Sequence, residues 1–139
     1  MVSGWWKDTG KPEDLLEANR MMLSVQQPGI EGEVDDASRL EGNVVIERGA
    51  KIVRSEIRGP AIVGEGTLVE GSFLGPNVSV YFGCSVTGSR VEDSIVMERC
   101  SIDGVRGLSG SILGRDVEVR RAKGAHRLVV GDQSRLELD

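Results

Sequence analysis

Four serines, Ser38, Ser55, Ser72 and Ser89, lie 17 residues apart, and an aliphatic residue follows each of them two positions later. A fixed period this short indicates one supersecondary unit that is repeated several times. Aromatic residues make up only 4% of the chain and 19 residues are glycine. Together these features predict many tight turns around a stacked core of small aliphatic side chains.

Aliphatic residues then recur in steps of six, six and five, which sum to the 17-residue period. An amphipathic helix would need steps of three and four, and a hairpin strand would need longer alternation. The steps instead predict a coil with three short sides, whose turns stack through parallel strand pairing. We therefore expect a mainly β fold, a parallel β-helix of about four to five coils. The predicted inward residues are Leu40, Ile46, Ile52, Ile57, Val63, Val69, Leu74, Val80, Val86, Val91 and Met97.

The pattern loosens after Met97. The next inward position falls on Asp103, and Ile102 replaces it if the register shifts by one residue. Near the end of the chain, residues 128–138 predict two short strands around Gly131-Asp132.

The segment before the repeats predicts a helix over residues 11–25. Pro12 suits the first helical position, where its missing N–H costs no hydrogen bond. Glu13 and Asp14 place negative charge near the positive end of the helix dipole. Pro28 cannot continue the hydrogen-bond ladder, so the helix ends before it.

Charge and composition exclude several classes of partner. The net charge of −5 provides no basic field for nucleic acid. No apolar run approaches the roughly 18 residues of a membrane span, and the start of the chain lacks the features of a signal peptide. Cys84 and Cys100 have no zinc-site spacing, so we interpret them as small buried hydrophobes in a reducing compartment. These features predict a soluble, cytoplasmic protein with neither nucleic acid nor membrane as a partner.

Two segments outside the repeats resemble a known family. "GWWKDTGKPEDLLEANR" (Gly4–Arg20) and "HRLVVGDQSRLEL" (His126–Leu138) are similar to sugar-1-phosphate nucleotidylyltransferases, above all long-type glucose-1-phosphate thymidylyltransferases. The hexad steps resemble the left-handed β-helix of hexapeptide-repeat proteins, an exception to the usual right-handed crossover. The resemblance implies three parts: a remnant of the catalytic domain with one helix (1–29), the left-handed β-helix (30–122) and C-terminal capping strands (123–139).

The resemblance also implies an activity and a site. In this family glucose 1-phosphate attacks the α-phosphorus of dTTP, which gives dTDP-glucose and pyrophosphate with the help of Mg²⁺. Asp8 occupies the position of a magnesium ligand, and Trp6 and Gly10 the positions that shape the wall of the sugar pocket. The alternative is that Asp8-Thr9-Gly10 is only a turn that leads into the helix.

The chain lacks the motifs with which this family binds the nucleotide. The glycine-rich signature G-G-x-G-T-R-L, the second metal aspartate and the phosphate-binding lysines are absent from these 139 residues. The glycines of "GEGTLVEG" (Gly64–Gly71) fall on repeat corners, so they are structural turns. We therefore expect the C-terminal part of such an enzyme, from a truncated or split gene. Alone it should have no catalytic residue and no bound cofactor, and should serve the assembly of a homo-oligomer.

Two further functions remain open. The chain could be a stand-alone oligomerisation module, since flat β-helix faces can pair across a symmetry axis. A hexapeptide acyltransferase would need a histidine base, and the single histidine, His126, is expected in a solvated tail beyond the regular coils.

Two surface features are also expected outside the regular coils. A basic cluster forms either a solvated face or an anchor for an acidic partner or a phosphate; its members are Arg115, Arg120, Arg121, Lys123 and Arg127. Trp5 and Trp6 would pack against a catalytic domain.

Overall fold

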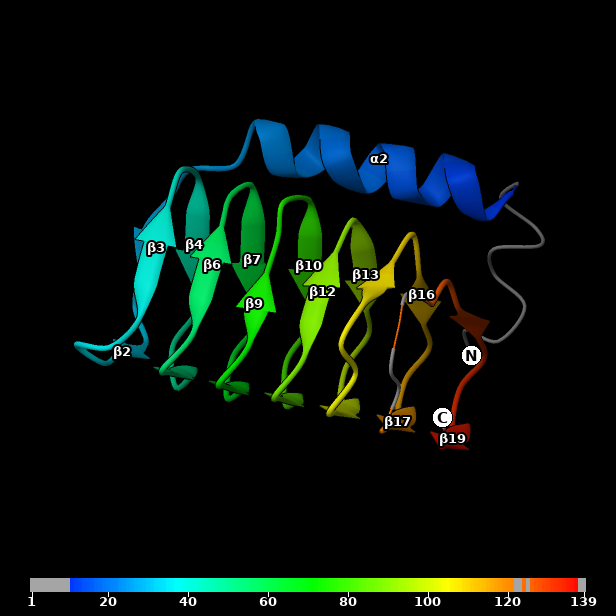
Figure 1. The fold of residues 1–139 in the computed structure, drawn as a ribbon. Coiled ribbons are helices and arrows are strands. Elements are labelled where there is room, and N and C mark those ends of the chain that lie inside the picture. The colour runs from blue at the N-terminus through cyan, green and yellow to red at the C-terminus, as the bar shows by residue number, and fades with distance from the viewer. Residues whose placement is uncertain (1–10, 122–123, 125, 138–139) are drawn as a thin grey trace.

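The computed structural model describes residues 11–121, 124 and 126–137, and Figure 1 shows their arrangement. Short strands wind around three sides of a prism, and each strand pairs in parallel with its counterparts in the neighbouring coils. The predicted mainly β, left-handed parallel β-helix is confirmed. Five coils have a strand on all three sides, and two more coils follow with strands on two sides. The stack is therefore longer than the four to five coils expected.

The strands form three sheets, which we call A, B and C. Sheet A contains β1 (Gly29–Ile30), β4 (Val44–Ile46), β7 (Ala61–Val63), β10 (Val78–Val80), β13 (Ser94–Val96), β16 (Ile112–Leu113) and β18 (Val129–Val130). Sheet B contains β2 (Glu33–Val34), β5 (Lys51–Val53), β8 (Leu68–Glu70), β11 (Ser85–Thr87), β14 (Ser101–Asp103), β17 (Glu118–Arg120) and β19 (Arg135–Glu137). Sheet C contains β3 (Arg39–Glu41), β6 (Glu56–Arg58), β9 (Phe73–Leu74), β12 (Arg90–Glu92) and β15 (Leu108–Ser109). The strands β18 and β19 lie within the segment 123–139 and extend sheets A and B.

The interior is a set of aliphatic ladders. On sheet C, Ile57, Leu74 and Val91 lie in consecutive coils, each no more than 1% exposed. Burial of one such side chain stabilises the fold by about 1.5–3 kcal/mol relative to leaving it in water. Leu40, in the first coil, is only partly buried because no coil lies below it.

One predicted inward residue is wrong. Val96 pairs with Val80 and fills the position expected for Met97. Two residues, Glu92 and Asp93, separate Val91 from Ser94, whereas three residues, Gly75-Pro76-Asn77, separate their paired counterparts Leu74 and Val78. The corner before β13 is therefore one residue shorter, which shifts the register by one position, so Ile102, not Asp103, is inward on sheet B.

The repeated serines form a hydrogen-bonded ladder along the corner between sheets B and C. The Oγ of Ser55 accepts the backbone N–H of Ser72 at 3.1 Å, and the Oγ of Ser72 accepts that of Ser89 at 3.1 Å. The same hydroxyl of Ser72 donates to the carbonyl of Glu70 at 2.9 Å. Each serine therefore satisfies a buried backbone donor of the next coil, which accounts for the 17-residue period.

A second ladder follows the corner between sheets A and B. The backbone N–H of Cys84 donates to Thr67 Oγ1 at 3.1 Å, and that of Cys100 donates to Cys84 Sγ at 3.4 Å. Both thiols are free and buried, as predicted. The hydrogen bond with Cys84, together with burial, raises the pKa of the Cys100 thiol.

The helix α2 (Pro12–Ser24) confirms the predicted helical segment. It lies along sheet A and runs opposite to the direction in which coils are added (Figure 1). Leu16 packs with Ile95, Met97 and Ile112, so the outward aliphatic residues of sheet A bury the apolar face of the helix. The buried Asn19 accepts a hydrogen bond from the Ser79 hydroxyl at 2.5 Å.

Candidate functional site

The motif residues predicted from the resemblance, Trp6, Asp8 and Gly10, lie outside the described residues, as does Trp5. Their roles, and the alternative of a plain turn, stay predictions. Among residues 11–121, 124 and 126–137, no three His, Cys, Asp or Glu side chains are grouped to hold a metal ion.

His126 does not lie in a solvated tail. Its backbone bridges Leu108 of β15, so it continues sheet C by one position. The N–H of His126 donates to the carbonyl of Gly107 at 2.6 Å, and its carbonyl accepts the N–H of Ser109 at 3.0 Å. The expectation of a position beyond the coils was wrong, because the backbone of His126 pairs within the stack.

The predicted basic cluster is divided among different contacts. Arg127, at the corner just before β18, pairs with Glu13 of α2 at 3.1 Å, and Arg115 lies 3.9 Å from the Asp132 carboxylate. Arg120 belongs to β17, and Lys123 lies outside the described residues. At least two of these cations therefore serve contacts within the chain.

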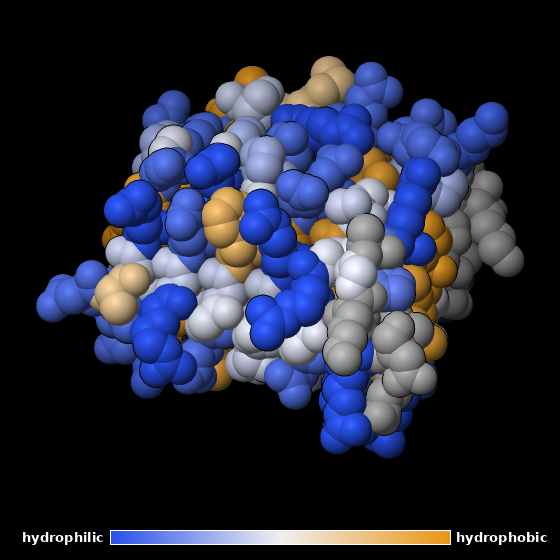
Figure 2. Space-filling model, viewed as in Figure 1, coloured by the Kyte–Doolittle hydropathy of each residue, from blue (hydrophilic) through white to orange (hydrophobic). Residues whose placement is uncertain are grey.

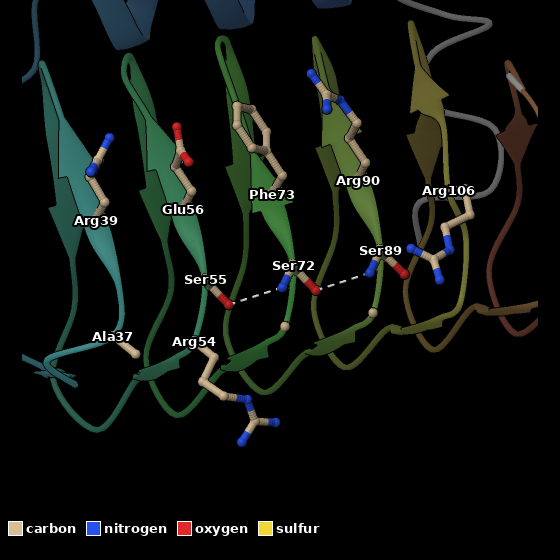
Figure 3. Close-up of a pocket in the computed structure, with 12 residues that line it drawn as sticks. Ala37, Arg39, Arg54, Ser55, Glu56, Ser72, Phe73, Ser89, Arg90 and Arg106 are labelled. Atoms are coloured by element: carbon tan, nitrogen blue, oxygen red, sulfur yellow. Dashed lines mark hydrogen bonds between the residues drawn. The ribbon is translucent and has the colours of Figure 1, made fainter.

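The first surface hollow is an arginine groove of about 650 Å³ along the outer side of sheet C and its corner with sheet B. Figure 3 shows Phe73 and Arg90 standing on neighbouring strands above the serine ladder. The Arg90 guanidinium lies 4.4 Å from the centre of the Phe73 ring, a cation–π contact. The groove is lined by Ala37, Arg39, Arg54, Ser55, Glu56, Gly71, Ser72, Phe73, Gly88, Ser89, Arg90 and Arg106.

The arginine groove has little capacity for acid–base or nucleophilic chemistry. The hydroxyls of Ser55, Ser72 and Ser89 are already engaged in the ladder. Carboxylates on the same surface offset the cations, since Arg54 pairs with Glu70 at 2.6 Å and Arg58 lies 3.6 Å from Glu56. The view in Figure 2 shows this side of the molecule as mostly hydrophilic. Such a surface suits solvation and weak polar recognition.

The second hollow is an apolar groove of about 510 Å³ between the C-terminal half of α2 and the carboxyl ends of β7 and β10 in sheet A. Tyr81 and Phe82, at the corner between sheets A and B, are 41% and 46% exposed, and Met22 on the helix is 65% exposed. Burial, and then the nearby charge of Glu98, raises the pKa of the Tyr81 phenol. The groove is lined by Met22, Leu23, Gln26, Glu47, Ile62, Gly64, Glu65, Ser79, Val80, Tyr81 and Phe82.

Sequence reasoning missed the apolar groove. One signal was present, because Tyr81-Phe82 occupies the corner position where the neighbouring coil carries Gly64-Glu65. The sequence could not show the groove itself, because α2 forms its other wall and the sequence does not place the helix beside this corner.

No protein-family model matches the sequence. The chain is 44% identical over 141 residues to glucose-1-phosphate thymidylyltransferases from Streptomyces antibioticus and Streptomyces griseus; the match covers 99% of this chain and 40% of each relative. It is 35% identical to the low-salt glycan biosynthesis nucleotidyltransferase Agl11 of Haloferax volcanii, again over 99% of this chain and 40% of the relative. The chain thus spans about two-fifths of the length of these curated relatives.

A solved structure shares the fold. The acetyltransferase domain of PglB from Neisseria gonorrhoeae superposes with a TM-score of 0.57 and 14% identity, over 84% of this chain and 63% of that domain. At this identity the likeness concerns architecture alone. The helix of the described residues is too short and too polar to cross a membrane.

Proposed function

Because the chain is related over 99% of its length to a two-fifths part of two glucose-1-phosphate thymidylyltransferases, we propose that it is the β-helical part of such a nucleotidyltransferase. The observation that carries the proposal is this continuous match, which includes the N-terminal segment as well as the repeats. The reaction proposed for the whole enzyme joins glucose 1-phosphate to the α-phosphorus of dTTP and releases pyrophosphate. A cytoplasmic location follows from the intracellular supply of these substrates.

Within the enzyme, the chain's own role is assembly. Its described part is a prism filled with aliphatic side chains, with flat faces that can pair across a symmetry axis. The two grooves on its surface suit recognition better than bond-making, as the engaged serine hydroxyls illustrate. We therefore assign it the role of holding catalytic parts in a homo-oligomer, without turnover of its own.

Assay and sedimentation of the purified chain test this role. With dTTP, glucose 1-phosphate and Mg²⁺, pyrophosphate release should stay at the background rate, while the Streptomyces antibioticus enzyme serves as the positive control. Turnover by the chain alone would contradict the absence of catalysis. A monomer at micromolar concentration in sedimentation velocity would contradict the role in assembly.

Asp8 is the residue through which the chain would contribute to Mg²⁺. A chimera can test this, with the chain replacing the matching part of the Streptomyces antibioticus enzyme. If Asp8 is a ligand, Asp8→Asn lowers activity at limiting Mg²⁺ by at least about tenfold, and excess Mg²⁺ restores part of it. Equal activity of the chimera and its Asp8→Asn variant at every Mg²⁺ concentration would favour the alternative, in which Asp8-Thr9-Gly10 is only a turn that leads into the helix.

A further inference from the structure

We propose that the apolar groove is the surface on which the nucleotidyltransferase part of the enzyme docks, an inference that rests on the proposed function. The first support is the distribution of exposed apolar side chains. Seven large hydrophobic side chains are exposed among the described residues. Three of them, Met22, Tyr81 and Phe82, line the groove, and two more, Met21 and Val25, lie at the same end of α2. Exposed apolar residues gathered in this way mark an interaction surface.

The groove is preformed. Leu23, at its base, is only 3% exposed, so the helix side is anchored in the fold. The Gln26 amide donates to the carbonyls of Ala61 at 3.0 Å and Asn43 at 3.3 Å, which fixes the chain just beyond the helix. Little ordering entropy therefore opposes binding.

The chemistry of the groove indicates what its partner must offer. The Ser79 hydroxyl in the lining is already bonded to Asn19, so the floor offers mainly apolar contact. Glu47 and Glu65 supply the charges of the lining, both negative. A complementary partner inserts an apolar side chain and places Lys or Arg at the rim.

The size of the relatives identifies this partner as the nucleotidyltransferase part. The 141 matched residues are 40% of the Streptomyces antibioticus enzyme, so about 210 of its residues lie outside the match. A domain of that size has a radius of gyration of about 17 Å, whereas the 13 residues of α2 extend only about 20 Å. A domain joined at the start of α2 is therefore large enough to reach the groove at the helix's other end.

Hydrogen exchange can test the docking in two forms of the protein, the 139-residue chain alone and the chimera described above. In the chimera, amides of residues 20–26 and 80–84 should exchange at least about fivefold more slowly than in the chain alone. Phe82→Ser, and separately Met22→Ser, should abolish this extra protection without lowering the melting temperature of the isolated chain. Leu68→Ser, at a half-buried position on the outer side of sheet B, is the matched control and should leave the protection intact.

Each outcome separates docking from the proposed function. Equal exchange in the chain and the chimera overturns the docking, even if the chimera is active. Protection in the chain alone that grows with concentration also overturns it, because a second copy then occupies the groove. An inactive chimera with a protected groove upholds the docking and counts against the proposed function.

Discussion

The guanidinium of Arg20 makes a two-point ion pair with the carboxylate of Asp93, with Nε–Oδ1 at 2.8 Å and Nη2–Oδ2 at 3.0 Å. The pair joins the middle of α2 to the corner that is shortened before β13. Asp93 has a φ of 48°, so its carboxylate is held on a strained turn and points to the helix.

Loss of this pair should have a small effect. The side chains are 43% and 32% exposed, so Arg20→Gln should lower the free energy of unfolding by no more than about 1 kcal/mol. Urea titrations of Arg20→Gln, Asp93→Asn and the double variant measure the coupling, which should weaken with added salt. Arg48→Gln at an exposed corner is the control. A coupling of zero at low salt would show that other contacts hold the helix.

Removal of one serine hydroxyl from the ladder should cost more. Ser72→Ala leaves the N–H of Ser89 without its acceptor in a corner where both serines are buried. We expect a loss of about 1–3 kcal/mol in the free energy of unfolding, measured by urea denaturation. Ser85→Ala, on the outer side of sheet B, should stay within about 0.5 kcal/mol. Similar values for the two variants would contradict the role of the ladder.

Two glycines of one coil should respond differently to alanine. A Cβ at Gly75 would collide with the backbone carbonyl of Arg58, and its φ of 98° disfavours any side chain. At Gly71 the φ is 59° but the space is open. Thermal unfolding should show a loss above about 2 kcal/mol for Gly75→Ala and near 1 kcal/mol for Gly71→Ala. A larger loss for Gly71→Ala than for Gly75→Ala would show that the backbone at Gly75 moves to make room for the added Cβ.

Much of the fold could be predicted from the sequence, because the inward ladder depends on local spacing. Ile46, Val63 and Val80 show the 17-residue period directly. At Val96 and Met97 both neighbours are apolar, so the spacing could not reveal the shorter corner at Asp93. The shorter corner makes Val96 inward and leaves Met97 to pack against Leu16 of α2, a contact between distant segments.

The candidate site was less predictable for the same reason. Ile95 and Ile112, on the outer side of sheet A, were a sign that something covers that sheet. The sequence predicted the helix α2 but not the sheet against which it packs. The apolar groove needs both the docked helix and the corner at Phe82, which lie far apart in the chain.

Acid should weaken the first coils through Asp35. The Ser38 hydroxyl, and after it the backbone N–H of Arg54, lowers the pKa of the Asp35 carboxyl below its usual range. The stability from these bonds is present above the unfolded-state pKa of about 3.9 and is lost as pH falls through the lower folded-state pKa.

Urea midpoints measured from pH 5 to pH 2.5 check this expectation. The midpoint of the native chain should fall more steeply than that of Asp35→Asn, with Asp36→Asn as the neighbouring control. Parallel curves for the native chain and Asp35→Asn would show that protonation of Asp35 does not contribute to the loss of stability in acid.

The opposed directions of α2 and the coils have a consequence for synthesis on the ribosome. The helix emerges before the coils, and its partners in the coils emerge progressively later from one end of the helix to the other. The contacts of Gln26 with Asn43, Arg20 with Asp93 and Glu13 with Arg127 span 17, 73 and 114 residues. The nascent helix should therefore attach from its C-terminal end and close toward its N-terminal end as translation proceeds. Proteolysis of stalled nascent chains would reveal that order, and the Glu13–Arg127 ion pair would form last, after residue 127 has left the exit tunnel.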